Sequence, residues 1–460
     1  MVELRLDQIA RKINGTILQG SPSVSFHRFN IDSRLTAPGE LFFALVARRN
    51  GHHYIPDAIK RGAAGAVISQ RVNIPEEDVA LVLVPDTLKA LQNLARKVLE
   101  EHKVNVVGIT GSTGKTTTKE FCFQLLCSSF QVLKSEGNFN NQLGLPLSLL
   151  RLNDSHQVAI LEMAMSAAGE IKALTEIAPP DVSVITNICP VHLEFFKSIE
   201  EIALAKREIL EGMRKGGRAV LNGDDPKVKK IAKDWQGEKI TFGLSRDCDV
   251  RALNIQKRGY EGMMFELLYG HQHEKISLPF FLESFLYNFL AAAATSYALS
   301  LPLGDFLERI HSLKPLPGRG VLLSLKGGIK IFDDSYNSNP KALETVLKGL
   351  SELPSQRKVA VLGDMLELGE KEIAYHVHAG HQVARWGWDC LITVGPLSRH
   401  MAEGAVSSGM KRKQIRSFRD SSEAARSILD IIQEGDLVLV KGSRAVKTER
   451  IIEKLKSAGM

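Results

Sequence analysis

The sequence has little of what marks secreted, membrane or fibrous proteins. Its five cysteines form no CxxC pair and no even framework, which favours reduced thiols and argues against a thiolate metal site. The N-terminal residues MVELRLDQIARKING carry acidic side chains where a signal peptide has an apolar run. The most apolar long stretch, 289–303, contains Thr, Ser and Tyr and is too short to cross a bilayer. We therefore expect a cytoplasmic protein without a membrane span.

No low-complexity segment and no solenoid-period repeat is present either. With 44% apolar and 24% charged residues, the 460-residue chain has the composition of an ordinary globular protein. The net charge of +7 suits an anionic partner. The basic residues are scattered, however, and do not alternate with aromatic ones as in single-strand-binding proteins. The charge alone does not choose among nucleic acid, a membrane surface and phosphorylated small molecules, although the scatter of the basic residues gives no sign of nucleic-acid binding.

The alternation of apolar runs and helical patterns predicts an α/β protein of three domains. We expect a small N-terminal α/β substrate domain over 1–102. A central P-loop ATPase domain with a largely parallel sheet should follow over 103–316, ending in an antiparallel stretch near 250–279 and an Ala-rich helix. Four strand-like runs alternating with helices predict a C-terminal doubly wound, Rossmann-like domain over 317–460.

The strongest chemical signal is a glycine-rich loop between an apolar strand run and a helical pattern. It reads Thr110-Gly111-Ser112-Thr113-Gly114-Lys115-Thr116-Thr117. Backbone N–H groups of such a loop converge on phosphate oxygens, the lysine reaches the terminal phosphates and the Thr116 hydroxyl can bind Mg²⁺. Only two residues separate Gly111 from Gly114, so the loop is a variant of the general pattern. We predict that it binds a nucleotide.

Two further side chains follow strand-like runs at the expected carboxyl edge of the same sheet. Glu162 ends the run VAILE, and His192 comes a few residues after VSVITN. Ligands bind along this edge in open α/β sheets, so both residues are candidates for metal binding near the P-loop. Taken singly, each also fits an ordinary solvent-facing side chain.

Lys206 occupies an unusual position on the helical pattern over 198–213. The apolar stripe of this helix runs through Ile199, Ile202, Ile209 and Met213, and Lys206 falls on the same face. A lysine there either snorkels to solvent or is buried. A buried lysine loses its proton easily and becomes a nucleophilic amine, which would permit capture of CO₂ as a carbamate.

Two polar segments offer more hydrogen-bonding groups than a turn requires. One contains Asn138, Asn140 and Asn141, which suit a sugar or nucleotide as well as an ordinary turn. The other, DDSYNSNP, begins at Asp333. Upstream of it, Arg319 could bind a phosphate through both guanidinium nitrogens.

Taken together, these motifs resemble the Mur ligase family over the whole chain. The chain matches six features of the family in order. They are TGxxGK[ST], a strand-end Glu, a downstream His, a carbamylated Lys, an Asn heading an Ala-rich helix and a DD-containing segment ending in NP. The matching positions are 110–116, Glu162, His192, Lys206, Asn288 and 333–340.

Longer strings resemble the branch of the family that adds D-alanyl-D-alanine to UDP-N-acetylmuramoyl-tripeptide. They are DSR at 32–34, NGHHYIPDAIKRGAAGAV, GNFNNQLGLPLSLL, LGDMLELGE and KGSRAVKTERI. The family usually has His before the helix-heading Asn, where this chain has Tyr287.

The resemblance implies an ATP-dependent, Mg²⁺-requiring amide ligase. It implies catalytic roles for Lys115, Glu162, His192 and a carbamylated Lys206, the last three of which would bind metal together with Thr116. ATP contacts are implied for residues 111–117 and for Asn288, Arg319, Asp333, Tyr336 and Asn337. The UDP-linked substrate is expected near Ser33 and Arg34 and near Asn138, Asn140 and Asn141. We expect a monomer.

Two alternatives remain open on the sequence. One is a related Mur ligase or a folylpolyglutamate-type ligase with a different amine substrate. Ligases of the folylpolyglutamate type share the central and last domains, although the N-terminal DSR unit argues against them. A P-loop NTPase that drives rearrangement of nucleic acid or protein is a different class, and it predicts ATP turnover stimulated by a polymer rather than by a dipeptide.

Overall fold

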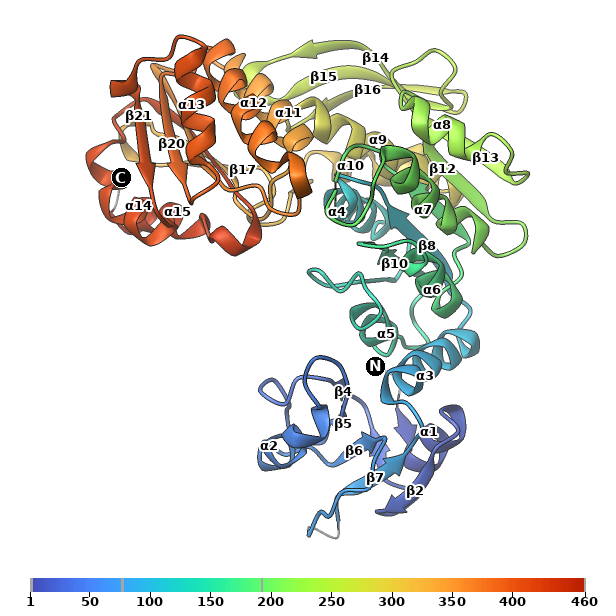
Figure 1. Ribbon diagram of the computed structural model, residues 1–460. Coiled ribbons are helices and arrows are strands. Elements are labelled where there is room, and N and C mark those ends of the chain that lie inside the picture. The colour runs from blue at the N-terminus through green and yellow to red at the C-terminus, as the bar shows by residue number, and fades with distance from the viewer. Residues whose placement is uncertain (1–2, 76–77, 192, 459–460) are drawn as a thin grey trace.

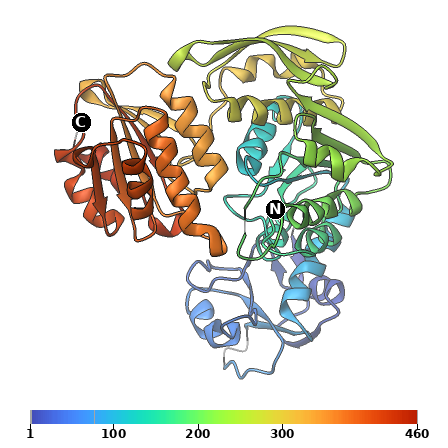
Figure 2. The same cartoon turned by 45° about the horizontal axis from the view of Figure 1, so that its top comes forward.

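The chain is arranged as three successive α/β units that form an arc (Figure 1). The computed structural model describes residues 3–75, 78–191 and 193–458. The N-terminal unit lies at one end of the arc and the C-terminal unit at the other, with the largest sheet between them. The turned view in Figure 2 shows the same arrangement. Among the residues that the structure describes, no helix combines the length and the apolar character needed to cross a bilayer.

The N-terminal unit is built on a five-stranded sheet in the order β2-β7-β6-β5-β4. Strands β4 to β7 are parallel, and β2 pairs antiparallel with β7. The elements are β1 (Leu4–Arg5), α1 (Leu6–Lys12), β2 (Thr16–Gln19), β3 (Ser25–Phe26), β4 (Phe29–Asn30), β5 (Leu41–Phe43), α2 (Ile55–Lys60), β6 (Gly65–Ile68), β7 (Ala80–Leu83) and α3 (Thr87–Glu101). Helix α3 also packs on α5 and α6 of the next unit, so it joins the two.

The central unit contains a nine-stranded sheet in the order β16-β15-β14-β13-β12-β11-β8-β10-β9. Strands β8 to β14 run parallel, and β14 to β16 form an antiparallel extension. The elements are β8 (Asn105–Thr110), α4 (Lys115–Leu126), β9 (Val132–Lys134), α5 (Gly144–Leu149), β10 (Val158–Glu162), α6 (Glu170–Ile177), β11 (Val182–Ile185), α7 (Ile199–Glu211), β12 (Arg218–Asn222), α8 (Pro226–Ala232), β13 (Glu238–Gly243), β14 (Val250–Lys257), β15 (Met263–Tyr269), β16 (Gln272–Leu278), α9 (Glu283–Ala298) and α10 (Leu303–Ile310).

The strand order of this sheet positions the site. The chain leaves β8 toward β9 on one side and returns through β10 to β11 on the other side. In open α/β sheets ligands bind where the order reverses in this way, beyond the carboxyl ends of the strands. The P-loop therefore lies between the ends of β10 and β11.

The C-terminal unit has a six-stranded sheet in the order β17-β18-β22-β19-β20-β21, parallel except for β17. Its elements are β17 (Val321–Ser324), β18 (Lys330–Asp334), α11 (Pro340–Ser351), β19 (Arg357–Gly363), α12 (Glu372–Arg385), β20 (Cys390–Val394), α13 (Arg399–Ser407), β21 (Ile415–Phe418), α14 (Ser421–Ser427), β22 (Asp436–Lys441) and α15 (Glu449–Ser457). This unit packs on the central one, for example through the rings of Phe281 and Phe332, whose centroids are 5.6 Å apart.

Helix α9 is the centre of the apolar core around which the site is built. Phe289, Leu290 and the alanines 291–294 are all fully buried. A helix that is apolar all round is enclosed on every side, and each fully buried Phe or Leu stabilises the fold by roughly 1.5–3 kcal/mol. The small alanines allow close packing, and α9 contacts both α4 and the strands β12 and β13.

The mixed α/β architecture, the largely parallel central sheet and its antiparallel extension are confirmed. The prediction of four strands in the last unit was incomplete, because β17 and β21 were not expected. Both are four-residue edge strands with exposed or partly exposed side chains, which leave little apolar pattern in the sequence. The division at 102 and 316 stays a prediction.

Candidate active site

The P-loop follows β8 and is shaped by two glycines in positive-φ conformations. Gly111 has φ 148°, and Gly114, which precedes α4, has φ 79°. A Cβ at Gly111 would lie 1.9 Å from Thr186 Oγ1, and one at Gly114 would lie 2.3 Å from Asn288 Oδ1. No other residue type fits at either position without moving the loop, which explains both glycines of the motif.

The segment that follows β11 holds the P-loop in place. The Ser112 backbone N–H donates to the Asn187 carbonyl at 2.9 Å, and the Thr113 N–H donates to Asn187 Oδ1 at 3.0 Å. Thr186 Oγ1 donates to the Thr113 carbonyl at 2.6 Å. The loop is therefore preformed. Sequence reasoning missed Asn187, because its contact with the P-loop depends on β11 lying beside β8.

Lys115 lies folded over the loop that it follows. Its Nζ donates to the Gly111 carbonyl at 2.8 Å. Burial lowers the pKa of Lys115, the Glu162 carboxylate opposes this effect and the nearby Arg319 guanidinium adds to it. Arg319 comes from the segment before β17, so a cation of the C-terminal unit faces the P-loop.

Glu162, at the end of β10, is held in place by two side chains. Thr116 Oγ1 donates to Glu162 Oε2 at 2.9 Å, and Asn140 Nδ2 donates to Glu162 Oε1 at 2.9 Å. The carboxylate is only 3% exposed. The strand-end acid thus reaches the P-loop threonine, as its position in the sequence predicted.

This pair fits a magnesium ion. Mg²⁺ prefers hard oxygen ligands and is usually held by one or two carboxylates, substrate phosphates and water rather than by a full protein cage. Thr116 and Glu162 supply such oxygens at the P-loop. Among the described residues no group of three or more His, Cys, Asp or Glu side chains could hold a metal ion, in keeping with that mode of binding. The predicted ligand His192 lies outside the described residues.

Lys206 on α7 is buried, with 2% of its surface exposed, beside Ile202 and Ile209. The inward position predicted from the helical spacing is confirmed. Within the described part of the chain, its ammonium has no hydrogen-bond or ion-pair partner. Burial lowers the pKa of Lys206 well below its ordinary value, and the nearby charge of Lys115 lowers it further, while Cys189 acts in the opposite direction. The surroundings of Lys206 therefore favour the neutral amine more than water does.

A second buried lysine, Lys119 on α4, was not anticipated. Its Nζ donates to the Ser135 carbonyl at 2.7 Å and to the Gly137 carbonyl at 3.4 Å, and lies 3.5 Å from Glu120 Oε1. These contacts tie the P-loop helix to the start of the asparagine-rich loop. Lys119 thereby positions the loop that carries Asn140.

The three predicted asparagines of that loop have different environments. Asn138 is exposed. Asn140 binds Glu162, and Asn141 Oδ1 accepts the backbone N–H groups of Leu143 and Gly144 at 3.1 and 3.0 Å, at the start of α5. Only Asn140 thus contacts the candidate metal ligands, whereas Asn141 supports the local fold.

Asn288 on α9 lies beside the P-loop helix. It is 8% exposed, and its Oδ1 accepts a hydrogen bond from Thr118 Oγ1 at 3.3 Å. The neighbouring Tyr287 hydroxyl donates to Asp224 Oδ2 at 2.8 Å. The predicted residue Asn288 thus lies at the P-loop, where its side-chain oxygen accepts a hydrogen bond from Thr118.

On the C-terminal side, Tyr336 is flanked by two arginines. The guanidinium carbon of Arg319 lies 3.8 Å from the centroid of the Tyr336 ring, and that of Arg444 lies 5.3 Å from it. Such stacking restrains Arg319 without neutralising its charge. The arginine can therefore be presented toward the P-loop while remaining able to bind an anion.

Of the other predicted residues in this segment, one stabilises a turn and another is exposed at the surface. Asp333 Oδ1 accepts the Ser335 hydroxyl at 2.6 Å, so it shapes the turn after β18. Asn337 is exposed, and its carbonyl accepts from Lys441 Nζ at 2.9 Å. Lys441 also pairs with Asp334, whose pKa is raised by burial and lowered in part by this lysine.

Ser33 and Arg34 lie between β4 and β5 in the N-terminal unit, away from the P-loop between β8 and α4 (Figure 1). Ser33 is 7% exposed, whereas the Arg34 side chain is exposed and pairs with Asp32 at 2.7 Å. The hydrogen bond from Arg34 lowers the pKa of Asp32. The structure does not bring these two residues together with the phosphate site.

Comparisons with known proteins cover the whole chain. Residues 109–296 match the Mur ligase middle domain, and residues 318–444 match the Mur ligase glutamate ligase domain. UDP-N-acetylmuramoyl-tripeptide–D-alanyl-D-alanine ligase of Bacillus subtilis is 32% identical over 99% of this chain and 99% of its own length.

Solved structures give the same picture. The crystal structure of MurF from Acinetobacter baumannii superposes with a TM-score of 0.90 at 28% identity, covering 99% of both chains. MurF ligase from Thermotoga maritima in complex with ADP has a TM-score of 0.82 at 31% identity and covers 94% of this chain and 97% of its own.

Proposed function

Because this chain belongs to the Mur ligase family, we propose that its site catalyses the family's ATP-dependent formation of an amide bond. The chain joins D-alanyl-D-alanine to UDP-N-acetylmuramoyl-tripeptide and releases ADP and phosphate. The observation that carries this function is the convergence of Lys115, Arg319 and the Thr116–Glu162 pair at one sheet edge in a chain similar to such ligases over its full length.

In the first step, the terminal carboxylate of the tripeptide attacks the γ-phosphate of ATP. An acyl phosphate forms and ADP leaves. Charge builds on the transferring phosphoryl oxygens, so positioned cations are the main catalytic requirement. Lys115 would exchange its contact with the Gly111 carbonyl for a phosphate oxygen, and Arg319 would approach from the C-terminal side. The N–H groups of residues 111–117 would hold the nucleotide.

Thr116 and Glu162 would hold Mg²⁺, which supplies further charge stabilisation at the phosphates. We also propose that Lys206 carries a carbamate and, with His192, completes a second metal position. The support is chemical: a buried amine with a lowered pKa and no partner among the described residues can react with CO₂, and the product would be an anion near the cation of Lys115. Asn140 would keep Glu162 oriented.

In the second step, the free amine of D-alanyl-D-alanine attacks the acyl phosphate. The tetrahedral intermediate collapses to the amide, and the acyl–oxygen bond to phosphate breaks. Water must be excluded, since hydrolysis would waste the intermediate. Closure of the C-terminal unit on the central one would achieve this and would bring Asp333, Tyr336 and Asn337 toward the nucleotide held by Asn288 and the P-loop.

We assign the uridine end of the substrate to the N-terminal unit near Ser33 and Arg34, and its peptide to the loop with Asn138, Asn140 and Asn141. The arc places the first unit where a long substrate could extend away from the P-loop (Figure 1). The reaction needs no second copy of the chain, so we propose a monomer acting in the cytoplasm, where ATP and UDP-sugars are found.

The test is phosphate release from ATP with each candidate pair of substrates. We expect release only when UDP-N-acetylmuramoyl-tripeptide and D-alanyl-D-alanine are both present with Mg²⁺, and mass spectrometry should detect the pentapeptide product. Activity with a folate and glutamate, or stimulation by a nucleic acid or a polypeptide instead of the dipeptide, would overturn the proposal.

A further inference from the structure

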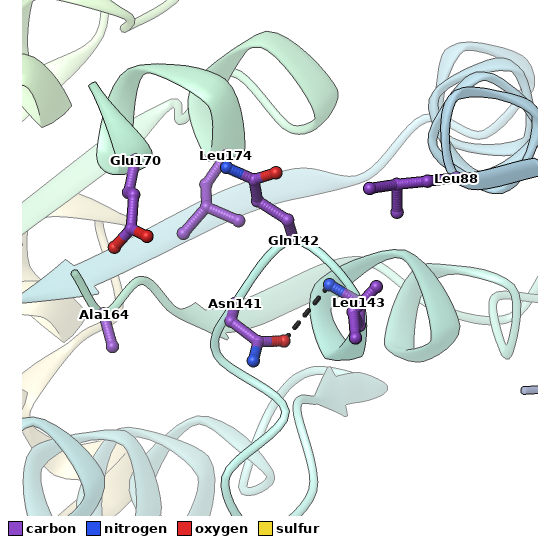
Figure 3. A pocket seen from close by; sticks show the side chains of 7 residues that line it. All are labelled: Leu88, Asn141, Gln142, Leu143, Ala164, Glu170 and Leu174. Atoms are coloured by element: carbon purple, nitrogen blue, oxygen red, sulfur yellow. Dashed lines mark hydrogen bonds between the residues drawn. The ribbon is translucent and has the colours of Figure 1, made fainter. Parts of the chain in front are cut away.

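A pocket of about 280 Å³ lies beside the candidate active site, and apart from Asn141 its lining residues have no role in the mechanism described above. Figure 3 shows that its lining comes from helix α3, the asparagine-rich loop, the segment after β10 and helix α6. The lining residues are Leu88, Asn141, Gln142, Leu143, Ala164, Glu170 and Leu174.

The pocket has an apolar wall and one acidic group. Leu88, Leu143 and Leu174 supply aliphatic surface, and the Glu170 side chain extends from the start of α6 toward the segment that carries Ala164 (Figure 3). Among the described residues, no Lys, Arg or His side chain lines the pocket. An aliphatic chain that ends in a cation matches this combination of surfaces.

Glu170 is held in position and still has an oxygen to offer. Its Oε2 accepts the backbone N–H groups of Ser166 and Ala167 at 2.6 and 3.2 Å. Its Oε1 accepts no hydrogen bond from the residues that the structure describes. One oxygen of this partly buried carboxylate is held by hydrogen bonds and the other can still accept one. Such a carboxylate can bind an ammonium group with little loss of side-chain conformational entropy.

The pocket adjoins the place where the peptide carboxylate would react. Asn141 follows Asn140, which binds Glu162, and the Ala164 backbone N–H donates to the Asn140 carbonyl at 2.9 Å. Ala164 is also two residues beyond Glu162, a separation of at most roughly 7 Å between their Cα atoms. A residue whose carboxylate lies at Thr116 and Glu162 could therefore place its side chain in the pocket.

We propose that this pocket binds the side chain of the third residue of the tripeptide, and that Glu170 recognises the ammonium group at its end. The assignment rests on the proposed function. Lysine and diaminopimelate both carry an ammonium group at the end of an aliphatic chain of this length, so the shared chemistry is a cationic amine on three or four methylenes. Glu170 is a specificity residue in this scheme, and it takes no part in phosphoryl transfer.

The test compares three UDP-N-acetylmuramoyl-tripeptides, whose third residue is lysine, diaminopimelate or 2-aminoheptanoate. In the last of these a methyl group replaces the lysine ammonium. With the wild-type chain we expect kcat/KM for the lysine substrate to exceed that for 2-aminoheptanoate by about 10- to 100-fold, the usual contribution of a charged hydrogen bond. The diaminopimelate substrate reports whether the additional carboxylate is accepted.

In Glu170→Gln the ratio of lysine to 2-aminoheptanoate turnover should fall toward one. Glutamine keeps an acceptor for Ser166 and Ala167, and a general folding defect would lower both rates together and leave their ratio unchanged. Glu176→Gln, on an exposed position of the same helix, is the matched control and should keep the wild-type ratio.

Equal turnover of lysine and 2-aminoheptanoate substrates by the wild-type chain would overturn the pocket assignment and leave the ligase function intact. If Glu170→Gln keeps the wild-type ratio of lysine to 2-aminoheptanoate turnover, the pocket assignment is likewise overturned and the ligase function stays intact. Failure of all three substrates to support dipeptide-dependent phosphate release would instead overturn the proposed function and, with it, the assignment of this pocket.

Discussion

The regions around Lys119 and Lys206 bury the same side chain in opposite ways. Lys119 has no exposed surface and donates to the carbonyls of Ser135 and Gly137, with Glu120 nearby. Lys206 is equally enclosed but faces another cation, Lys115, and has no partner among the described residues. A buried charge without a partner is costly, so a lysine of that kind is expected to be neutral. The difference separates a lysine that builds the site from one that is ready to react in it.

The same contrast indicates what the cation cluster is for. The Arg319 guanidinium lowers the pKa of Lys115, and Lys115 in turn lowers the pKa of Lys206, whereas the Glu162 carboxylate raises the pKa of Lys115. Without bound anions, the charges of Lys115 and Arg319 repel each other, and the charge of Lys115 opposes protonation of Lys206. A triphosphate and a carbamate would each relieve that repulsion, so the region is arranged for anions that arrive during the reaction.

The largest effect should come from removing the reactive lysine. Lys206→Ala should lower kcat on the order of 100-fold, the size of effect seen when a positioned electrostatic group is lost. The measurement is phosphate release with both substrates, repeated with added formate or acetate, which should restore part of the activity by occupying the space of the carbamate. The exposed Lys215 provides the control variant Lys215→Ala. Full activity of Lys206→Ala would remove the carbamate from the mechanism.

The next effect concerns the partnered lysine. Lys119→Met leaves the buried carbonyls of Ser135 and Gly137 without their donor, so we expect the free energy of unfolding to fall by about 1–3 kcal/mol. Urea unfolding measures it. Lys206→Met is the matched comparison and should be no less stable than the wild-type chain, because it replaces an amine that has no partner among the described residues with an apolar side chain. Equal losses in the two variants would break the comparison.

Sequence patterns anticipated one of these lysines and not the other for a physical reason. Helix α7 has one buried face, so Ile202 and Ile209 reveal the direction in which Lys206 points. Helix α4 is buried on nearly all sides between the sheet and α9, and its pattern has no periodic contrast that would single out Lys119. The P-loop and Glu162 were found because their chemistry is local to a strand end.

Long-range features stayed out of reach. That Asn187 braces the P-loop depends on β11 lying beside β8, and that Arg319 faces Lys115 depends on how the C-terminal unit packs on the central one. Neither follows from residue spacing. The pocket at Glu170 is assembled from four separate segments and was likewise not predicted.

A pH titration of stability sharpens the contrast further. The folded-state pKa of Lys206 lies well below its ordinary value, so between that pKa and about 10.4 the unfolded chain binds more protons than the folded one. Stability must therefore rise with pH in this window, with a slope of up to about 1.4 kcal/mol per pH unit. In CO₂-depleted buffer, the difference in the free energy of unfolding between wild type and Lys206→Met should narrow as the pH is raised. The contribution of Lys115 is present in both chains and therefore cancels in this difference. A constant difference would mean that Lys206 is charged in the folded protein.

The smallest expected effect concerns two adjacent asparagines, one of which contacts the site while the other stabilises the local fold. Asn140 binds the Glu162 carboxylate, whereas Asn141 accepts two backbone N–H groups at the start of α5. We expect Asn141→Ala to lower the free energy of unfolding by about 1 kcal/mol, the usual net contribution of a side-chain hydrogen bond. Asn141→Asp keeps the accepting oxygen, so the difference between the two variants in urea unfolding isolates these hydrogen bonds from the loss of side-chain volume. If alanine and aspartate give the same stability, Asn141 is not committed to the fold, and its side chain would be as available to the substrate as that of Asn138.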